Sequence, residues 1–262
     1  MASRLHALSR TELLIGRAAL DVLARSKVAV YGIGGVGTFA VEGLVRAGVR
    51  RFVLVDDDKV CLTNLNRQLH ATTKTIGQYK VDAMKARILE IAPDAEVEAV
   101  RRFYLPEVGA ELVPPDCDYL VDCVDTVAAK VDLAVRAQAL GIPIVSAMGA
   151  GNKLDPTRFE VADVYATEMC PLARVMRKEL KLRGVARLKV VYSKEKPAES
   201  ATPEEAGCAT GCVCPPGVDR RCTSRRRVPG SISFVPSVAG MILAGEVVKD
   251  LIAQGGKPHG GR

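Results

Sequence analysis

The stretch Val28-Ala29-Val30-Tyr31-Gly32-Ile33-Gly34-Gly35-Val36-Gly37 decides the fold of this 262-residue chain. Its first four residues form a short apolar run, which is typical of a buried strand in a parallel sheet. The strand runs directly into a loop with four glycines. After Thr38 the apolar residues return at helical spacing, on one face that includes Phe39 and Leu44. The stretch therefore predicts a strand, a loop and a helix whose free N–H groups and positive dipole end favour a bound phosphate.

An acidic residue follows the next apolar run. Arg51-Phe52-Val53-Leu54-Val55 predicts a second strand, and Asp56 closes it. A carboxylate at this place in a doubly wound fold can accept hydrogen bonds from a ribose hydroxyl. A tight turn without a ligand would need the same glycines. The glycine loop and Asp56 together nevertheless indicate a nucleotide site.

The rest of the first 150 residues alternates between helical and strand patterns. We expect helices over 10–23, 81–91 and 127–140, and strands over 97–101, 119–125 and 142–147. This alternation predicts an α/β fold of the Rossmann-like type, with a mostly parallel sheet and helices on both of its faces. Ligands of such sheets bind outside the carboxyl ends of the strands.

The composition changes after Ala150. We expect a single domain over 1–262, in which residues 166–230 form an inserted segment that is basic and rich in cysteine. The core should resume with a strand over 232–235 and a helix over 238–252, and residues 255–262 should form a loose tail. The longest uncharged stretch, 228–245, contains two prolines and barely reaches a membrane-spanning length, so we assign it to the core.

The net charge of the chain is positive. The formal value is +7, from 37 Lys and Arg against 30 Asp and Glu. This favours an anionic partner such as nucleic acid, although a basic housekeeping enzyme would have the same composition. The first ten residues are mixed and polar, unlike a signal peptide. We therefore expect a cytoplasmic protein without a membrane segment, whose eight cysteines are thiols or metal ligands rather than disulfides.

A long polar connection after the second strand distinguishes between nucleotides. Asn64, Arg67 and Lys80 follow Asp56 within one α/β unit. They supply an amide, a planar guanidinium and a point charge, which suit a triphosphate better than the two phosphates of NAD. Asp125, after the strand that begins at residue 119, can hold Mg²⁺ against those phosphates or shield the approach of a reacting carboxylate.

These motifs, in this order, resemble the ubiquitin-activating-like superfamily of adenylating enzymes, the ThiF/MoeB type. The resemblance is carried by the glycine loop, Asp56, Asn64-Leu65-Asn66-Arg67-Gln68, Gly77-Gln78-Tyr79-Lys80 and Asp122-Cys123-Val124-Asp125. Within the superfamily, three stretches resemble the tRNA threonylcarbamoyladenosine dehydratase branch: residues 66–71, 146–150 and 155–159. Residues 234–240 are similar to the form found in Gram-positive bacteria. The resemblance covers the chain except for about residues 197–227.

The resemblance implies an ATP-dependent cyclisation of a modified adenosine beside the tRNA anticodon, through an acyl-adenylate. It implies that phosphates lie against Gly32, Gly34, Gly35 and Gly37, and that Asp56 holds the ribose. It also implies that the charge of the α-phosphate is stabilised by Asn64, Arg67 and Lys80, and that Mg²⁺ is positioned by Asp125. Members of the superfamily pair as homodimers in which an N-terminal arginine reaches the partner's site. Arg10 is the first candidate for that role and Arg17 the second.

Two other functions remain open at this point. One is an adenylyltransferase that activates the C-terminus of a sulfur-carrier or ubiquitin-like protein. The other is a nucleotide-binding protein without this chemistry, or an NAD-dependent oxidoreductase, against which Arg67 and Lys80 argue. His70 is better explained as a hydrogen-bonded structural residue than as a base, because the substrate carboxylate is already ionised. Cys170 has no neighbour in sequence that would lower its pKa, and we assign it no role.

The segment over 166–230 contains two further features. Its basic residues would suit tRNA phosphates, although a solvated helix face would look the same: Arg174, Arg177, Lys178, Lys181, Arg183, Arg187 and Lys189, then Arg220, Arg221, Arg225, Arg226 and Arg227. Four cysteines in C-x3-C-x-C-x7-C spacing could hold zinc: Cys208, Cys212, Cys214 and Cys222. This spacing departs from the two C-x2-C pairs used for zinc elsewhere in the superfamily, which argues against sulfur-carrier activation. A sulfur-relay partner protein stays open.

Overall fold

The structure is a computed structural model, which describes residues 5–199 and 229–255. The four cysteines of the proposed zinc motif, the second group of arginines and the predicted tail from residue 256 onward lie outside the described residues. Within the described residues, none of the helices combines the length and the apolar character that a membrane crossing requires.

The described chain contains one sheet of seven strands: β1 Lys27–Tyr31, β2 Arg51–Val55, β3 Glu96–Val100, β4 Tyr119–Asp122, β5 Ile144–Ala147, β6 Phe159–Asp163 and β7 Lys189–Ser193. The strand order is β3-β2-β1-β4-β5-β7-β6. Every neighbouring pair is parallel except β6 and β7. Tyr31, the last residue of β1, is level with Val55 of β2 and with Asp122 of β4. The carboxyl ends of the three central strands therefore form one edge.

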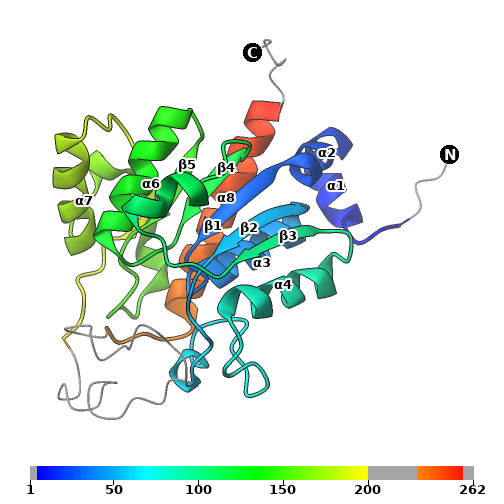
Figure 1. The fold of residues 1–262 in the computed structure, drawn as a ribbon, viewed down its shortest axis with the longest axis horizontal. Coiled ribbons are helices and arrows are strands. Elements are labelled where there is room, and N and C mark those ends of the chain that lie inside the picture. The colour runs from blue at the N-terminus through cyan, green and yellow to red at the C-terminus, as the bar shows by residue number, and fades with distance from the viewer. Residues whose placement is uncertain (1–4, 200–228, 256–262) are drawn as a thin grey trace.

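Helices cover both faces of the sheet (Figure 1). They are α1 Ser9–Ile15, α2 Arg17–Arg25, α3 Gly37–Ala47, α4 Lys80–Ile91, α5 Gly109–Leu112, α6 Val127–Leu140, α7 Pro171–Leu182 and α8 Phe234–Gly255. Short 3-10 turns are η1 Leu62–Asn64, η2 Pro106–Val108, η3 Pro156–Arg158 and η4 Val164–Ala166. The Rossmann-like α/β fold predicted from the sequence is confirmed.

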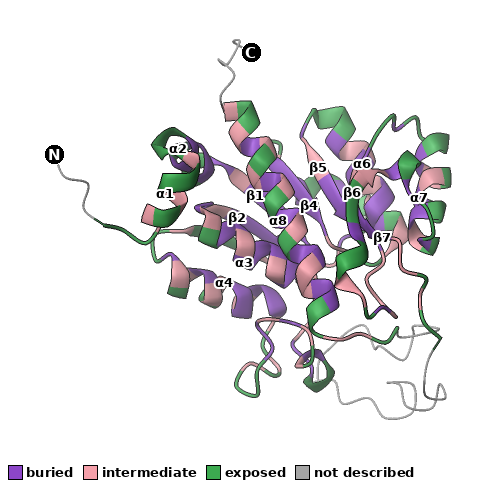
Figure 2. Ribbon diagram, turned by 180° about the vertical axis from the view of Figure 1, so that it is seen from behind, coloured by how far each residue is buried: buried purple, intermediate pink, exposed green. Residues whose placement is uncertain are grey.

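The alternation of side chains along the strands divides the core between the two faces. Val28 and Val30 of β1 pack with α3, α4 and α8 on one face. Ala29 and Tyr31 of the same strand pack with α5 and α6 on the other. Figure 2 shows the resulting buried strands between helices, most of which are buried on their inner sides and exposed on their outer sides. This two-sided burial explains why the strands are almost purely apolar in sequence.

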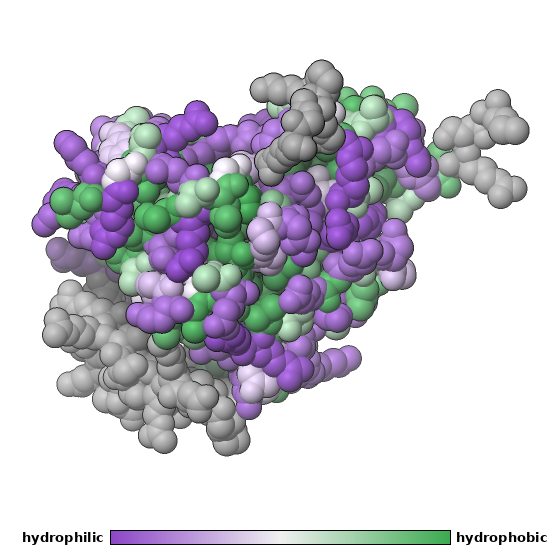
Figure 3. Space-filling model, turned by 45° about the horizontal axis from the view of Figure 1, so that its top comes forward, coloured by the Kyte–Doolittle hydropathy of each residue, from purple (hydrophilic) through white to green (hydrophobic). Residues whose placement is uncertain are grey.

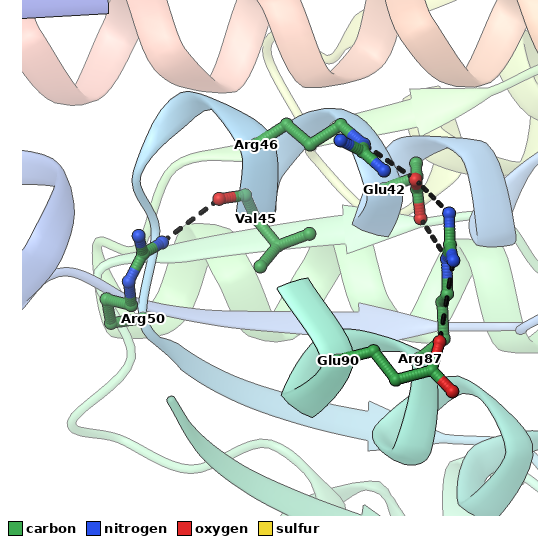
Figure 4. Close-up of polar contacts among 6 residues, drawn as sticks. All are labelled: Glu42, Val45, Arg46, Arg50, Arg87 and Glu90. Carbon is green, nitrogen blue, oxygen red and sulfur yellow. Dashed lines mark hydrogen bonds and ion pairs between the residues drawn. The ribbon is translucent and has the colours of Figure 1, made fainter. Parts of the chain in front are cut away.

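A polar cluster joins the two helices that flank the glycine loop and the polar connection (Figure 4). The buried Glu42 of α3 accepts hydrogen bonds from Arg46, at 2.7 Å, and from Arg87 of α4, at 2.9 Å. Burial by itself would raise the pKa of the Glu42 carboxyl, but the hydrogen bonds from Arg87 and Arg46 bring it below its usual range. Two guanidinium groups thus keep this carboxylate ionised and fix α4 against α3.

Four expectations for individual elements need correction. The leading helix is interrupted at Gly16, whose φ of +81° separates α1 from α2. The strand expected over 232–235 is wrong, because α8 begins at Phe234; Pro236 is tolerated in the first helical turn, where its missing N–H has no partner to lose. The fourth strand ends at Asp122, so Asp125 lies three residues beyond it. Residues 189–193, which we placed in an inserted segment, form β7, which lies in the sheet between β5 and β6.

Candidate nucleotide-binding site

The glycine loop lies at the carboxyl edge of the sheet, between β1 and β4. Gly32 has a φ of +85°, and a Cβ there would lie 2.7 Å from the carbonyl oxygen of Cys123. A Cβ on Gly37 would lie 1.9 Å from the carbonyl oxygen of Gly32. Only glycine fits at these two positions, because the loop after β1 packs against the backbone that follows β4 and also folds tightly on itself.

The loop presents unused hydrogen-bond donors. Within the described residues, the backbone N–H groups of Gly34, Gly35 and Val36 donate no hydrogen bond. They immediately precede α3, so they add to the positive end of its dipole. Such an arrangement is suited to the oxygen atoms of a phosphate.

Asp56 shapes the loop from the end of β2. Its Oδ2 accepts a hydrogen bond from the N–H of Ile33 at 2.7 Å, and its Oδ1 accepts one from the N–H of Asp58 at 2.8 Å. Burial raises the pKa of the Asp56 carboxyl, Asp58 adds to the rise, and Lys80 opposes it. Asp56 therefore has a structural role in the loop, and its ribose-binding role stays a prediction from the sequence.

The polar connection folds back over the glycine loop. A Cβ on Gly35 would lie 3.4 Å from Cγ of Arg67, and Oγ1 of Thr38 accepts a hydrogen bond from the N–H of Leu69 at 3.3 Å. Nε2 of His70 lies 3.0 Å from the carbonyl oxygen of Ile33. The structure thus brings Arg67 to the mouth of the loop, as the adenylation hypothesis requires.

Lys80 is the second cation at this place. It begins α4, its side chain is buried, and its Nζ lies 2.7 Å from Oδ2 of Asp58. Its charge also influences Asp56 and His70, lowering the pKa of each. Lys80 therefore lies against the acidic turn after β2. It contacts Asp58 and is close to Asp56, the carboxylate assigned to the ribose.

Two of the predicted polar residues are held by hydrogen bonds to neighbouring residues of the connection. Asn64 is buried, and its Oδ1 accepts a hydrogen bond from the N–H of Cys61 at 3.0 Å, within η1. Nη1 of Arg67 donates to the carbonyl oxygen of Thr63 and to Oδ1 of Asn66, both at 2.9 Å. These contacts fix the connection in the conformation that covers the loop.

The acidic residues offer two places for a cation. Asp125 is exposed, in the loop that faces the glycine loop. The carboxylates of Asp56, Asp57 and Asp58 lie within 4.8 Å of one another. We did not predict this second group from the sequence, although three consecutive aspartates are a visible signal for it.

Arg10 is not brought to this site in its own chain. It is exposed on α1. Leu8, two residues before Arg10, lies against Gly48 at the C-terminal end of α3. That end is about 16 Å along the helix from the glycine loop. A role for Arg10 therefore requires the site of another copy.

A buried lysine behind the site was missed in the sequence. Nζ of Lys130, on α6, donates to Oδ2 of Asp122 at 3.0 Å, to Oγ of Ser146 at 3.1 Å and to the carbonyl oxygen of Ala147 at 2.7 Å. All three side chains are at most 1% exposed. Oδ1 of Asp122 accepts from the N–H of Val124, so this cluster ties the Asp125 loop to the ends of β4 and β5.

The fold and the site together define a Rossmann-like nucleotide-binding protein with cations placed at its phosphate loop. The ThiF family model matches residues 8–260, and the chain belongs to the ThiF family. The predicted resemblance to the tRNA threonylcarbamoyladenosine dehydratase branch is confirmed. The chain is 44% identical, over 249 residues and 95% of each sequence, to the tRNA threonylcarbamoyladenosine dehydratase of Bacillus subtilis.

Further relatives include a second dehydratase, a solved dehydratase structure and an adenylyltransferase of lower identity. The dehydratase of Escherichia coli is 39% identical over 171 residues, which are 65% of this chain and 64% of that protein. The solved structure of E. coli tRNA N6-threonylcarbamoyladenosine dehydratase in complex with ATP has a TM-score of 0.80 at 30% identity, covering 95% of this chain and 94% of that one. The E. coli sulfur carrier protein ThiS adenylyltransferase is 34% identical over 55% of this chain and 59% of its own length.

Proposed function

We propose that this protein is an ATP-dependent dehydratase that cyclises threonylcarbamoyladenosine next to the anticodon of tRNA. The observation that carries the proposal is the position of Arg67 and Lys80, against the glycine loop and beneath the acidic turn after β2. A site for a dinucleotide alone does not need two cations there. Transfer of a nucleotidyl group does, because negative charge on the α-phosphate must be stabilised.

The residues present fit ATP. The loop has unused N–H donors, and no room for a side chain at Gly32 and Gly37. Within the described residues, Oε1 of Gln68 and Nδ1 of His70 are buried beside the loop without a hydrogen-bond partner. Buried polar atoms without a partner are costly, and a bound ligand or water would satisfy them. We assign the phosphates to the loop N–H groups and the ribose to Asp56.

The chemistry proposed is a two-step loss of water. An oxygen of the threonyl carboxylate attacks the α-phosphate of ATP, which forms the acyl-adenylate and releases pyrophosphate. The neighbouring carbamoyl group then attacks the activated carbonyl, the ring closes, and AMP leaves with the former carboxylate oxygen. Hydroxide is a poor leaving group and AMP a good one, so the protein has to supply mainly positioning and charge neutralisation. Asn64, Arg67 and Lys80 take this second role.

A magnesium ion belongs to the same proposal. Asp125 would hold it, and the three aspartates after β2 offer further carboxylates on the opposite side of the loop. When bound, the ion would neutralise phosphate charge. Excess EDTA should therefore abolish turnover, and added Mg²⁺ should restore it.

The proposal also includes a homodimer in which Arg10 completes the partner's site. Support comes from α1, where Leu13 is 88% exposed and Leu14 is 85% exposed, and from Leu5 at 93%. Figure 3 shows apolar surface among polar side chains on the side of the molecule where α1 lies. Large apolar side chains exposed together on a short helix favour burial against a second copy.

The remaining expectations have direct tests. We propose a single adenylation domain over 1–262 that acts in the cytoplasm, where tRNA is modified. Zinc at the four cysteines outside the described residues is tested by metal analysis of the purified protein. Turnover by the purified chain alone would exclude an obligatory sulfur-relay partner.

The central experiment uses the purified protein, ATP and tRNA that carries threonylcarbamoyladenosine. Mass spectrometry of the nucleosides should show the loss of one water, together with release of AMP and pyrophosphate. A parallel reaction contains a sulfur-carrier protein in place of tRNA. Adenylation of the carrier without dehydration of the nucleoside would replace our proposal with the alternative function.

A further inference from the structure

Helix α7 has two chemically different faces. Ala173, Met176 and Leu180 are fully buried, in a cluster shared with α6 and β7. Arg174, Lys178 and Lys181 are exposed. These three residues are spaced by four and three positions, so they lie on one side of the helix. The outer face of α7 is therefore a cationic stripe about 10 Å long.

Not every cation of the basic segment belongs to this stripe. Nη1 of Arg177 donates to the carbonyl oxygen of Thr167 at 2.7 Å. Arg183 is paired with Glu179 at 2.7 Å, and Lys189 with Asp250 at 2.7 Å.

The cations that remain combine exposure with the lack of an ion-pair partner in the described part of the chain. Arg174, Lys178, Lys181 and Arg187 are exposed, and within the described residues no carboxylate partners them. The structure thus separates four exposed cations without a carboxylate partner among the described residues from three that already make hydrogen bonds or ion pairs within the protein.

The stripe begins beside the proposed active-site edge. A Cβ on Gly149, two residues beyond β5, would lie 3.9 Å from Sγ of Cys170 and 4.0 Å from Cβ of Leu172 in the first turn of α7. The carboxyl end of β5 belongs to the same edge as that of β4, next to the glycine loop. A polyanion bound along the stripe can therefore extend to this edge.

We propose that the outer face of α7, extended by Arg187, is the surface that docks the phosphate backbone of tRNA. This inference rests on the proposed function and adds the place of contact. Four cations without aromatic residues among them suit sequence-independent contacts with phosphates rather than stacking on bases. Helix α7 lies at the opposite side of the molecule from α1 in Figures 1 and 2, so pairing through α1 leaves the stripe accessible.

The test measures tRNA binding by filter retention, from 50 to 300 mM salt, for the full chain and two variants. R174E/K178E/K181E should lower the affinity for tRNA by roughly a hundredfold at low salt, and reduce the slope of log K against log salt by about 2. K178E alone should reduce affinity about tenfold. The matched control is R25E, an exposed cation at the end of α2, which should bind tRNA like the unchanged chain.

Titration of ATP separates this surface from the nucleotide site. Both α7 variants should bind ATP with unchanged affinity, because no residue of the stripe contacts the glycine loop. Equal loss of affinity in K178E and R25E, or no loss in the triple variant, would overturn the surface assignment while the dehydration assay still supports the function. If the unchanged chain binds no tRNA and dehydrates no nucleoside, the proposed function itself fails and this inference with it.

Discussion

At the scale of single residues, His70 joins the polar segment after β2 to the glycine loop through a hydrogen bond to Ile33. Its Nε2 lies against a carbonyl oxygen, which can only accept, so the proton is on Nε2. Burial lowers the pKa of His70 to about 4, and the charge of Lys80 contributes. The imidazole is therefore neutral at physiological pH. We interpret it as a residue that positions the loop, which agrees with the structural role favoured from the sequence.

This position predicts an acid-sensitive stability. The unfolded chain binds a proton at His70 below pH 6.5, whereas the folded chain does so only near pH 4. The free energy of unfolding is therefore not reduced by His70 above pH 6.5. It falls as the pH drops from 6.5 towards 4, by up to about 1.4 kcal/mol per pH unit. Urea unfolding at pH 5 and 7 should show this dependence in the unchanged chain and less of it in H70Q. Equal pH dependence of both proteins would contradict the assignment.

The same histidine should affect ATP binding through its N–H. H70Q keeps a donor at similar reach, while H70A loses it. We expect H70A to raise KM for ATP roughly tenfold and H70Q to restore most of the difference. Identical KM values for the two variants would show that the hydrogen bond to Ile33 does not position the loop.

Lys80 should be required for turnover. K80A removes a cation assigned to the α-phosphate, and we expect a decrease of about 10²- to 10³-fold in kcat. Lys74, exposed in the same connection, provides the control K74A, which should retain activity. Circular dichroism shows whether the fold survives. Retained turnover in K80A would remove Lys80 from the mechanism.

At the scale of secondary-structure elements, the contact between α3 and α8 supports the glycine loop. A Cβ on Gly240 would lie 2.3 Å from the carbonyl oxygen of Val36 and 2.8 Å from Cβ of Phe39. G240A should therefore destabilise the protein by about 1–3 kcal/mol and weaken ATP binding. Gly245, five residues further along α8, has no atom of another element within 4 Å of such a Cβ.

That second glycine is the matched control. G245A introduces the same methyl group into the same helix, and should raise the free energy of unfolding by about 0.5–1 kcal/mol. Urea unfolding of the two variants compares them directly. Destabilisation by both substitutions would show that α8, rather than its contact with Val36, is sensitive to alanine.

The elements that sequence reasoning found are those with local signals. The strand before Gly32, the helix after it and the carboxylate at Asp56 each follow from a few neighbouring residues. The cluster of Lys130, Asp122 and Ser146 was missed because it joins residues up to 24 positions apart, and a lone lysine on a helix gives no sign that it is buried. The same limit explains the strand wrongly expected before Pro236, since its short apolar run is compatible with either structure.

At the scale of the whole molecule, the proposed dimer makes each site depend on two chains. A mixture of R10A and K80A protomers forms heterodimers in which one site lacks both residues and the other lacks neither. Each variant alone should be inactive, and mixing should restore about a quarter of the activity, because half of the dimers are mixed and each has one complete site. No recovery on mixing, with heterodimers demonstrated by mass, would exclude Arg10 from the partner's site.

The return of α8 to the glycine loop has a consequence for how the protein is made. A Cβ on Gly35, near the beginning of the chain, would lie 3.3 Å from Pro236, near its end. While a ribosome is still translating residues before 234, the loop lacks the helix that packs against it. A nascent chain arrested there should not retain ATP, and affinity should arise only after α8 has left the exit tunnel. We therefore expect nucleotide binding to begin only after α8 has been synthesised, although the glycine loop is made long before it.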